Sequence, residues 1–426
     1  MQLKMPYGKD SVGLRVEVPY TVLVPNEFEV ADEQLTLSKA INAPLGQGSL
    51  EAFVEQSRRL LVIVNDASRP TPTKTVLSEI SDILRSHPDL EFLVATGAHR
   101  APTPEEYTYI FGDLYEEFKS KIFAHDARKD SDMAYLGRSK RGTEIYLNKM
   151  VKEANGIIVI GSVEPHYFAG YTGGRKAFLP GVASYKTIEM NHKHALSAEA
   201  KSLALAGNPV HDDMADAMAL LSGIRVFSIQ TVLTGDHRIY AATAGDLTAS
   251  FDAAIEKANE IFCVRCERKG NIVVTAAPYP MDIDLYQSQK ALENGKLALE
   301  EGGVIILLSK CRMGVGEDAF LKLLSSAKDC KDVMAKIERG YKLGYHKAAK
   351  LAEIGTWACV WAVTDLPPKT ITEAKIVPKA GLQEAFDEAV ALIRSQGKKP
   401  YAVIMPQGSL TVPLIKGGGG KGGGRG

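Results

Sequence analysis

The chain has 426 residues, of which 45% are hydrophobic and 24% are charged, a composition typical of a soluble globular protein with more than one domain. Lys plus Arg and Asp plus Glu each total 51, so no net charge attracts the chain to nucleic acid or to an anionic membrane surface. The N-terminal residues MQLKMPYGKD contain no apolar signal core, and no apolar run reaches membrane-spanning length. These features predict a cytoplasmic protein that binds neither nucleic acid nor membranes.

Short apolar segments typical of buried strands recur along the chain, with helical patterns between them. The expected strands are LLVIV (60–64), EFLVATGA (91–98), GIIVIGS (156–162), IRVFSIQTVL (224–233), NIVVTAAP (271–278), GVIILLS (303–309) and YAVIMP (401–406). Residues 73–87, between the first two, have apolar side chains spaced for one face of a helix. Strands that alternate with helices predict an α/β fold with mainly parallel sheets.

The length of the chain and the position of its strands predict two α/β domains with a cleft between them. The segment CVRCERKGN (263–271) ends a helical pattern with charge and glycine before a new strand begins. We therefore expect an N-terminal domain over 1–265 and a C-terminal domain over 270–405. The remaining segment, 406–426, ends in the glycine-rich sequence KGGGGKGGGRG, which we expect to be a disordered tail.

The cysteine pattern predicts no disulfide framework and no zinc site. Cys263 and Cys266 form a C-x-x-C pair at the end of a helical pattern, but no second pair lies at zinc-ribbon spacing. The total of five cysteines is odd, which favours a reducing compartment.

Polar residues follow several of the expected strands, at the positions where parallel α/β sheets bind their ligands. They are Asp66 and Arg69 after 60–64, His99 and Arg100 after 91–98, His166, Arg175 and Lys176 after 156–162, and Tyr286, Gln287 and Lys290 after 271–278. These residues become candidates for one site if the strand ends meet.

Each candidate also has a purely structural explanation. Asp66 alone could cap a turn, and a lone histidine is more often a hydrogen-bonded structural residue than a catalytic one. His99 and His166, however, come directly after buried strands and beside Arg or Pro, whereas a core histidine more often lies within the strand. We therefore interpret them as acid–base candidates.

The stretch EPHYFAGYTGGRK (164–176) combines glycines with cations. Gly173 and Gly174 could cradle a phosphate through backbone N–H groups, with Arg175 and Lys176 adding positive charge. The stretch is not a Walker A loop, because an arginine intervenes and no Ser or Thr follows the lysine. His192 and His194 in EMNHKHAL are two residues apart, so at most one of them faces inward from a helix, and a two-histidine metal site is weakly indicated.

This combination of residues suggests acid–base chemistry on a small anion. Two histidines could flank one carbon of the substrate, while Arg and Lys hold its carboxylate. A 2-hydroxy acid, however, has a very weakly acidic α-carbon, so such a substrate would also require a metal or an electron-accepting cofactor.

The chain resembles the lactate racemase family, which depends on a nickel-pincer nucleotide. The matching blocks, in the family's order, are NDASRPTP (65–72), ATGAHR (95–100), EPHYFAGYTGGRK (164–176), the NH of EMNHKH (191–192), GNPVHDD (207–213) and YPMDIDLYQSQK (279–290). The resemblance covers essentially the whole chain except the glycine tail. It implies two α/β domains with the cofactor in the cleft between them.

The resemblance also implies roles for individual residues. The family's cofactor is a pyridinium-3-thioamide-5-thiocarboxylic acid mononucleotide of nickel, whose tether matches Lys176 and whose histidine ligand matches His192. The acid–base pair matches His99 and His166. Positions that handle the substrate match Arg69, Tyr286, Gln287 and Lys290, and Asp66, Gly173, Gly174 and Arg175 lie around the cofactor. Cofactor-biosynthesis proteins would be transient partners.

The implied reaction is racemisation or epimerisation of a 2-hydroxy acid by proton-coupled hydride transfer. None of the matched residues identifies the variable end of the substrate. Two alternatives stay open from the residues alone: a zinc-dependent lyase or hydrolase with His99, His166 and His192 on the metal, and a non-catalytic protein that binds an anion or nucleotide.

Overall fold

The computed structural model describes residues 2–416, and the predicted glycine-rich tail lies beyond Lys416, outside the described residues. The chain divides into two compact units. We call Glu27–Ile261 the central unit, and Met1–Asn26 together with Phe262–Gly426 the terminal unit. Within the described part of the chain, no helix has both the length and the apolar character needed to cross a membrane.

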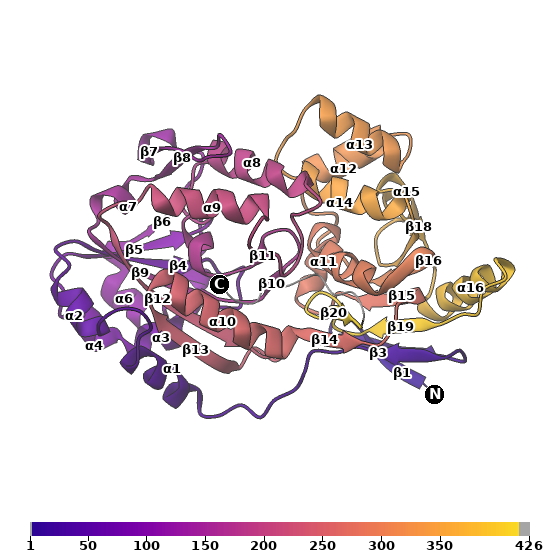
Figure 1. The fold of residues 1–426 in the computed structure, drawn as a ribbon, viewed down its shortest axis with the longest axis horizontal. Helices are drawn as coiled ribbons and strands as arrows, with labels where there is room; N and C mark the ends of the chain where they lie inside the picture. The colour runs from indigo at the N-terminus through magenta and orange to yellow at the C-terminus, as the bar shows by residue number, and fades with distance from the viewer. Residues whose placement is uncertain (1, 417–426) are drawn as a thin grey trace. The chain divides into compact units, whose positions relative to one another are not determined.

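The central unit is built on a sheet with the strand order β13-β12-β9-β4-β5-β6 (Figure 1). Neighbouring strands are parallel, except that β13 is antiparallel to β12. These strands are β4 (Leu60–Asn65), β5 (Leu90–Ala95), β6 (Ile122–Ala124), β9 (Gly156–Ser162), β12 (Arg225–Leu233) and β13 (Ile239–Gly245). Two small hairpins pair β7 (Met133–Arg138) with β8 (Glu144–Asn148) and β10 (Pro165–His166) with β11 (Gly170–Tyr171).

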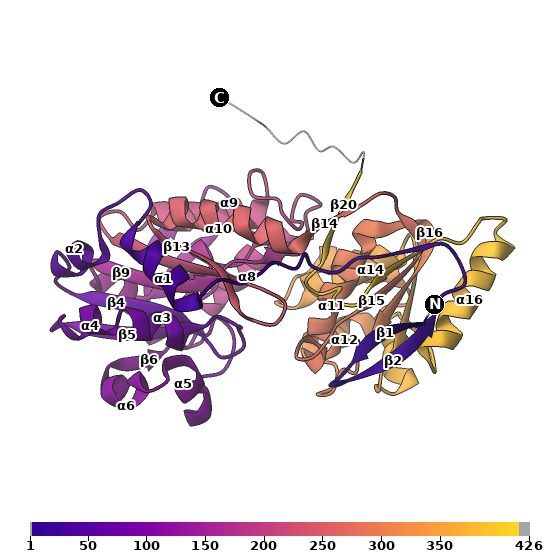
Figure 2. The same ribbon diagram turned by 90° about the horizontal axis from the view of Figure 1, so that it is seen from below.

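Helices cover both faces of this sheet, with α9 and α10 on one side and α3 and α4 on the other (Figure 2). The helices of the unit are α1 (Glu33–Asn42), α2 (Leu50–Glu55), α3 (Thr73–Glu79), α4 (Ser81–Arg85), α5 (Pro104–Phe111), α6 (Leu114–Phe118), α7 (Lys149–Glu153), α8 (Tyr185–Lys193), α9 (Pro209–Ala219) and α10 (Leu247–Phe262). Alternate strand residues such as Val62, Phe92 and Ile158 are fully buried against the helices on the α3 side, as the two-residue period of a strand requires. Val159 points to the opposite face.

The single helix expected over 73–87 is two helices in the structure. α3 and α4 are separated at Ile80, whose backbone angles, φ −104° and ψ 8°, are not helical. Val76, Leu77, Ile80 and Leu84 are nevertheless all buried in the core. The apolar face was therefore predicted correctly, although the helix is interrupted.

The terminal unit contains a parallel sheet with the order β18-β17-β16-β15-β19-β3. Its strands are β3 (Tyr20–Val22), β15 (Gly270–Ala276), β16 (Leu299–Leu308), β17 (Cys359–Val363), β18 (Val377–Pro378) and β19 (Ala402–Met405). Its helices are α11 (Leu285–Gly295), α12 (Asp318–Ser326), α13 (Cys330–Arg339), α14 (Tyr345–Gly355), α15 (Pro368–Glu373) and α16 (Leu382–Ser395). The predicted fold class, α/β with mainly parallel sheets, is confirmed.

The first 26 residues belong to the terminal unit, whereas we expected the N-terminal domain to begin at residue 1. β3 joins the sheet edge beside β19, with Tyr20 opposite Ala402. The hairpin of β1 (Gln2–Tyr7) and β2 (Asp10–Arg15) buries Met5 and Leu14 in the core that α16 also covers (Figure 2). These pairings join the two ends of the chain, so the local sequence pattern contained no signal for them.

The structure places the boundary between the units at 261/262, a few residues before the segment 264–270 that we expected. Cys263 and Cys266, expected at the end of a helical run, instead form β14 (Cys263–Cys266). This strand pairs in parallel with β20 (Val412–Ile415). The C-terminal segment is therefore ordered as far as this strand.

Candidate active site

Three neighbouring strands of the central unit carry polar residues at their carboxyl ends. β9, β4 and β5 lie side by side in that order and run in the same direction, so their carboxyl ends meet at one edge of the sheet. Asp66 follows β4, His99 follows β5, and His166 lies in β10, shortly after β9. The structure thus brings these predicted positions to one sheet edge.

His99 and Asp66 form a hydrogen-bonded pair at this edge. The Nδ1 atom of His99 lies 2.7 Å from Oδ2 of Asp66, and the side chain of His99 is 48% exposed while that of Asp66 is 9% exposed. Burial alone would raise the pKa of Asp66, but the hydrogen bond and charge of His99, with help from Arg69 and Ser68, lower this pKa below its ordinary value. Asp66 is therefore an ionised acceptor for the Nδ1 proton of His99.

The turn after β4 is fixed by short hydrogen bonds. The backbone N–H and the hydroxyl of Ser68 both donate to Oδ1 of Asp66, at 3.2 Å and 2.6 Å. The N–H of Arg69 donates to the Asp66 carbonyl at 3.2 Å. Thr71, two residues further on, shares a 2.8 Å hydrogen bond with Ser162 at the end of β9. Asn65 at the end of β4 donates to the same Thr71 hydroxyl at 2.7 Å, so Thr71 links the ends of β4 and β9.

The loop after β9 is closed by Thr172. Its hydroxyl donates to the Ser162 carbonyl at 2.9 Å and accepts from the N–H of Glu164 at 2.9 Å, while its own N–H donates to the Glu164 carbonyl at 2.8 Å. β10 then pairs with β11, with His166 opposite Gly170. His166 therefore lies on a hairpin rather than on a loose loop.

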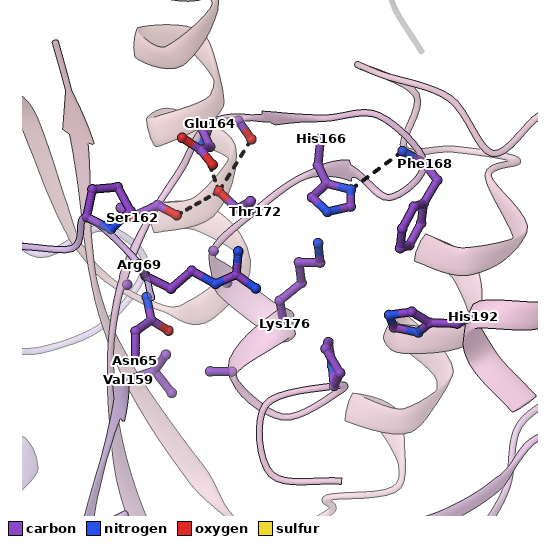
Figure 3. Close-up of a pocket in the computed structure, with 16 residues that line it drawn as sticks. Asn65, Arg69, Val159, Ser162, Glu164, His166, Phe168, Thr172, Lys176 and His192 are labelled. Carbon is purple, nitrogen blue, oxygen red and sulfur yellow. Dashed lines mark hydrogen bonds between the residues drawn. The ribbon is translucent and has the colours of Figure 1, made fainter. Parts of the chain in front are cut away.

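The imidazole of His166 is held in one orientation by its neighbours. Its Nδ1 accepts backbone N–H groups from Phe168 at 3.5 Å and from Ala169 at 3.3 Å, the first of which is drawn in Figure 3. The ring stacks on Tyr167, with centroids 4.9 Å apart, and meets the edge of Phe168 at 4.5 Å. Rotation of this ring would break these contacts.

Gly173 and Gly174 are required by packing and backbone conformation. Their φ angles are +80° and +53°, a region that other residues rarely adopt. A Cβ atom on Gly173 would lie 2.6 Å from Gln230, and one on Gly174 would lie 2.8 Å from the ring of Phe251. The N–H of Gly174 already donates to the side chain of Gln230 at 3.1 Å. The phosphate cradle expected from the sequence is therefore not needed to explain these glycines.

Arg175 was expected to add charge to a phosphate loop, but its guanidinium contacts other groups. Its Nη1 is hydrogen-bonded to the ring of His211 on α9, and its Cζ lies 5.1 Å from the ring centroid of Phe251. Burial, followed by the charge of Arg175, lowers the pKa of His211 to about 4, so this imidazole is a neutral acceptor. The pair connects α9 to the 3₁₀ turn Gly174–Ala177, which carries Lys176.

A pocket opens among these elements within the central unit (Figure 3). Its empty volume is about 650 Å³, part of it open solvent. Its lining residues are Asn65, Arg69, Pro70, Val159, Gly161, Ser162, Glu164, His166, Phe168, Thr172, Gly173, Gly174, Lys176, Ala177, Pro180 and His192. Figure 3 shows the side chains of Arg69, His166, Lys176 and His192 around a common space. Asp66, His99 and Arg175 are not among the lining residues.

His192, on α8, lies in this pocket, whereas His194 faces elsewhere. The His192 ring meets the ring of Phe168 at a centroid distance of 5.2 Å. Burial, followed by the positive charge of Lys176, lowers the pKa of His192 to about 3, so its imidazole is neutral and can act as a metal ligand. The Nε2 of His194 instead lies 3.9 Å from Asp213.

A buried carboxylate holds the helix turn that carries His192, and sequence reasoning did not find it. Asp213 on α9 accepts a 2.9 Å hydrogen bond from the amide of Asn191 and a 2.5 Å hydrogen bond from Ser139. Asn191 and Asp213 are both fully buried. The only available signal was that Asp213 ends the matched block 207–213.

The remaining predicted residues lie at the start of α11 in the terminal unit. These residues are Tyr286, Gln287 and Lys290. Asp284 caps the helix by accepting a hydrogen bond from the N–H of Gln287 at 2.6 Å. Lys347 on α14, a residue that sequence reasoning missed, is only 4% exposed. Its ammonium group is hydrogen-bonded to the Tyr286 carbonyl and lies 3.8 Å from the centroid of the Tyr286 ring. The start of α11 is therefore organised around buried charge.

Comparison with known proteins identifies the family that this arrangement belongs to. Residues 7–203 match the model of the lactate racemase N-terminal domain, and residues 264–412 match that of the lactate racemase C-terminal domain. The chain belongs to the lactate racemase family. The resemblance stated from the sequence is thereby confirmed.

Two curated lactate racemases are similar to this chain over most of its length. That of Thermoanaerobacterium thermosaccharolyticum is 32% identical over 346 residues, which cover 79% of this chain and 80% of that protein. That of Lactiplantibacillus plantarum is 31% identical over 386 residues, covering 88% and 90%. Both relatives are racemases and hence isomerases, in agreement with the enzyme class predicted for this family member.

Solved structures support the same assignment. The lactate racemase apoprotein of T. thermosaccharolyticum superposes with a TM-score of 0.90 at 29% identity, covering 97% of this chain and 100% of that one. A Thermotoga maritima protein of 16% identity superposes with a TM-score of 0.67, covering 91% of this chain and 100% of that one, and shares the fold.

The zinc alternative required three histidines around one ion. Among residues 2–416, no group of three His, Cys, Asp or Glu side chains is placed to hold a metal.

Proposed function

We propose that this member of the lactate racemase family inverts the C2 centre of lactate or a related 2-hydroxy acid, using a nickel-pincer nucleotide tethered to Lys176. The observation that carries the proposal is the convergence of His166, Lys176 and His192 in one pocket of a lactate racemase family chain. A lysine for attachment, a neutral imidazole for metal and a second imidazole for proton transfer are the groups that this chemistry needs.

The pocket residues fit such a cofactor. Lys176 offers a primary amine on a turn that is fixed by the glycines before it and by the Arg175–His211 pair. His192 offers a neutral nitrogen donor, which suits nickel. Arg69 lines the same pocket and supplies positive charge for an anionic group. When bound, the cofactor would accept the α-hydrogen of the substrate as hydride and return it.

The proton of the substrate hydroxyl is the part of the reaction that the protein's own side chains handle. In the proposal His99 and His166 exchange this proton with the substrate oxygen. Asp66, 2.7 Å from His99, stabilises the imidazolium that forms when His99 gains the proton. With the α-hydrogen removed together with its electron pair, the substrate would be a planar 2-keto acid, and C2 would be inverted if the hydrogen were regained on the other face.

The terminal unit contributes the groups that we propose for binding the substrate. At the start of α11, Lys290 would provide positive charge for the carboxylate, and Tyr286 and Gln287 would provide polar groups for its oxygens. Lys347 fixes the backbone of Tyr286. These assignments concern the part of the substrate that all 2-hydroxy acids share.

Intact mass of the purified chain, combined with metal analysis, tests the proposal. The chain should be co-expressed with cofactor-biosynthesis proteins, which we propose as its transient partners, and should then carry a covalent adduct and nickel. Lys176→Ala should lose both, whereas Lys193→Ala, which removes an exposed lysine from α8, should retain them. Bound zinc without an adduct after co-expression would refute the proposal.

The fate of the α-hydrogen tests the reaction itself. Racemisation of lactate in deuterated water should produce the opposite enantiomer without deuterium at C2, because the hydride does not exchange with solvent. Mass spectrometry of the product measures this directly. Substantial deuterium at C2 would indicate a carbanion instead.

A further inference from the structure

The two proposed acid–base histidines differ in the group behind each Nδ1 atom. Behind His99 lies the carboxylate of Asp66 at 2.7 Å, which is ionised and can only accept a hydrogen bond. Behind His166 lie the backbone N–H groups of Phe168 and Ala169, at 3.5 Å and 3.3 Å, which can only donate. The Nδ1 atom of His99 must therefore donate a hydrogen bond, whereas the Nδ1 atom of His166 must accept one.

These hydrogen bonds determine which ring nitrogen carries the proton when each imidazole is neutral. A neutral imidazole carries one proton, and the nitrogen without it is an acceptor. The Nδ1 of His99 must donate, so its Nε2 holds the lone pair. The Nδ1 of His166 must accept, so its Nε2 carries the proton. Stacking of the His166 ring on Tyr167 and its edge contact with Phe168 oppose a ring flip that would exchange these positions.

We propose that His99 and His166 rest in opposite tautomers, so that His99 is the proton acceptor and His166 is a hydrogen-bond donor toward the substrate oxygen. This inference rests on the proposed function for its chemical meaning, although the tautomers belong to the protein itself. From the resting state, the enantiomer whose hydroxyl faces His99 gives its proton to Nε2 of His99, and the product oxygen takes the Nε2 proton of His166. Solvent water then carries one proton from His99 to Nδ1 of His166, which releases its bonds to Phe168 and Ala169. The other enantiomer reacts by the same steps in reverse, so it first requires His166 to release these bonds.

The proposal has a thermodynamic consequence for a racemase. Lactate enantiomers are equal in free energy, so kcat/KM must be the same in both directions whatever the roles of the two histidines. A difference between the roles of the two histidines can appear only as proportional changes in kcat and KM between the two enantiomers. A direct observation of the ring protons is therefore more informative than kinetics.

Asp66→Asn is the variant that should invert one tautomer. Oδ1 of Asp66 accepts both donors of Ser68, so an asparagine would keep its carbonyl oxygen there and turn its NH₂ group toward His99. That NH₂ group donates to Nδ1 and moves the His99 proton to Nε2. Ser68→Ala leaves the carboxylate facing His99 and serves as the matched control.

Long-range ¹H–¹⁵N NMR of the full chain labelled with ¹⁵N-histidine tests the proposal without any cofactor. His99→Gln and His166→Gln assign the signals. We expect a protonated Nδ1 on His99 and a protonated Nε2 on His166, inversion of His99 in Asp66→Asn, and no change in Ser68→Ala. The same tautomer on both rings, or an unchanged His99 in Asp66→Asn, would overturn the inference.

Activity of the cofactor-loaded Asp66→Asn enzyme gives a second readout. Its kcat/KM should fall at least about 100-fold, and equally for the two enantiomers, because general-base catalysis is typically worth that much. If the wild type does not racemise 2-hydroxy acids at all, the proposed function is wrong. The tautomer assignment is tested separately, by NMR. Full activity in an Asp66→Asn enzyme with an inverted His99 would contradict the acceptor role.

Discussion

The loop after β9 and the start of α11 place functional residues by two different physical means. Residues 164–177 are fixed largely through backbone contacts, with glycines that leave no room for a methyl group and a hairpin that carries His166. The start of α11 is fixed by charge, through the Asp284 cap and the buried ammonium of Lys347. The first region should therefore be sensitive to added volume, and the second to lost charge.

The largest effect is expected from removing the acid–base chemistry of the β9 loop while leaving its backbone intact. His166→Gln should lower kcat/KM by about 10²- to 10⁴-fold, the usual contribution of a general acid or base. His99→Gln, after β5, should do the same. Intact mass should show that the Lys176 adduct remains. His237→Asn, at an exposed histidine, is the control. Retained activity in either variant would remove that histidine from the mechanism.

Gly174→Ala tests whether the β9 loop is fixed by lack of space. The new Cβ would lie 2.8 Å from the Phe251 ring at a φ of +53°, so we expect a loss of about 2–4 kcal/mol in the free energy of unfolding. Gly142→Ala is the matched control, because Gly142 has a φ of +88° but no atom within 4 Å of its added Cβ. It should cost only about 1 kcal/mol. Urea unfolding measures both, and equal losses would contradict the packing argument.

Lys347→Met tests whether the start of α11 is fixed by charge. Methionine removes the bond to the Tyr286 carbonyl and retains much of the volume. We expect kcat/KM to fall about tenfold, equivalent to about 1.4 kcal/mol. The melting temperature should also fall, because the Tyr286 carbonyl loses its donor and Asp284 loses a nearby positive charge. Lys342→Met, at an exposed lysine nearby, should leave kcat/KM unchanged. A large loss of stability with normal kinetics would indicate a purely structural lysine.

The smallest effect concerns the pH dependence of the β9 loop. The pKa of His211 is lowered to about 4 in the folded protein and returns to an ordinary value near 6.5 on unfolding, so the unfolded state binds the proton first. Stability from the neutral ring is present above pH 6.5 and is lost as the pH falls toward 4.

We expect the wild type to lose about 1–2 kcal/mol more than His211→Gln over this range, a figure reduced for the partial exposure of the ring. Urea unfolding at pH 7 and pH 4.5 measures the difference. Parallel pH profiles for the two proteins would show that the Arg175–His211 contact is not pH-sensitive.

Much of the central unit could be predicted because its signals are local. The buried strands 60–64 and 156–162 have continuous apolar sequences, and the parallel topology then required Asp66, His99 and His166 to meet at one sheet edge. The family blocks indicated Lys176 and His192, and the structure places both in one pocket. Periodicity and topology sufficed for Asp66, His99 and His166, whereas the roles of Lys176 and His192 came only from the family resemblance.

The features that were missed depend on contacts distant in sequence. Lys347 reaches Tyr286 across 61 residues, and Asp213 reaches Ser139 across 74. No local pattern distinguishes such residues from exposed Lys or Asp. Arg175 was expected near an anion, but the position of His211 on α9, which the sequence left undefined, determines where its guanidinium lies.

The assembly of the terminal unit from both chain ends has a consequence for synthesis. Thr21 shares a hydrogen bond with Tyr401, 380 residues later, so this unit cannot complete its sheet until nearly the whole chain has left the ribosome. The central unit, a continuous segment, can fold earlier. β3 must therefore remain unpaired while the unit that contains the pocket folds, and it takes its place at the sheet edge among the last.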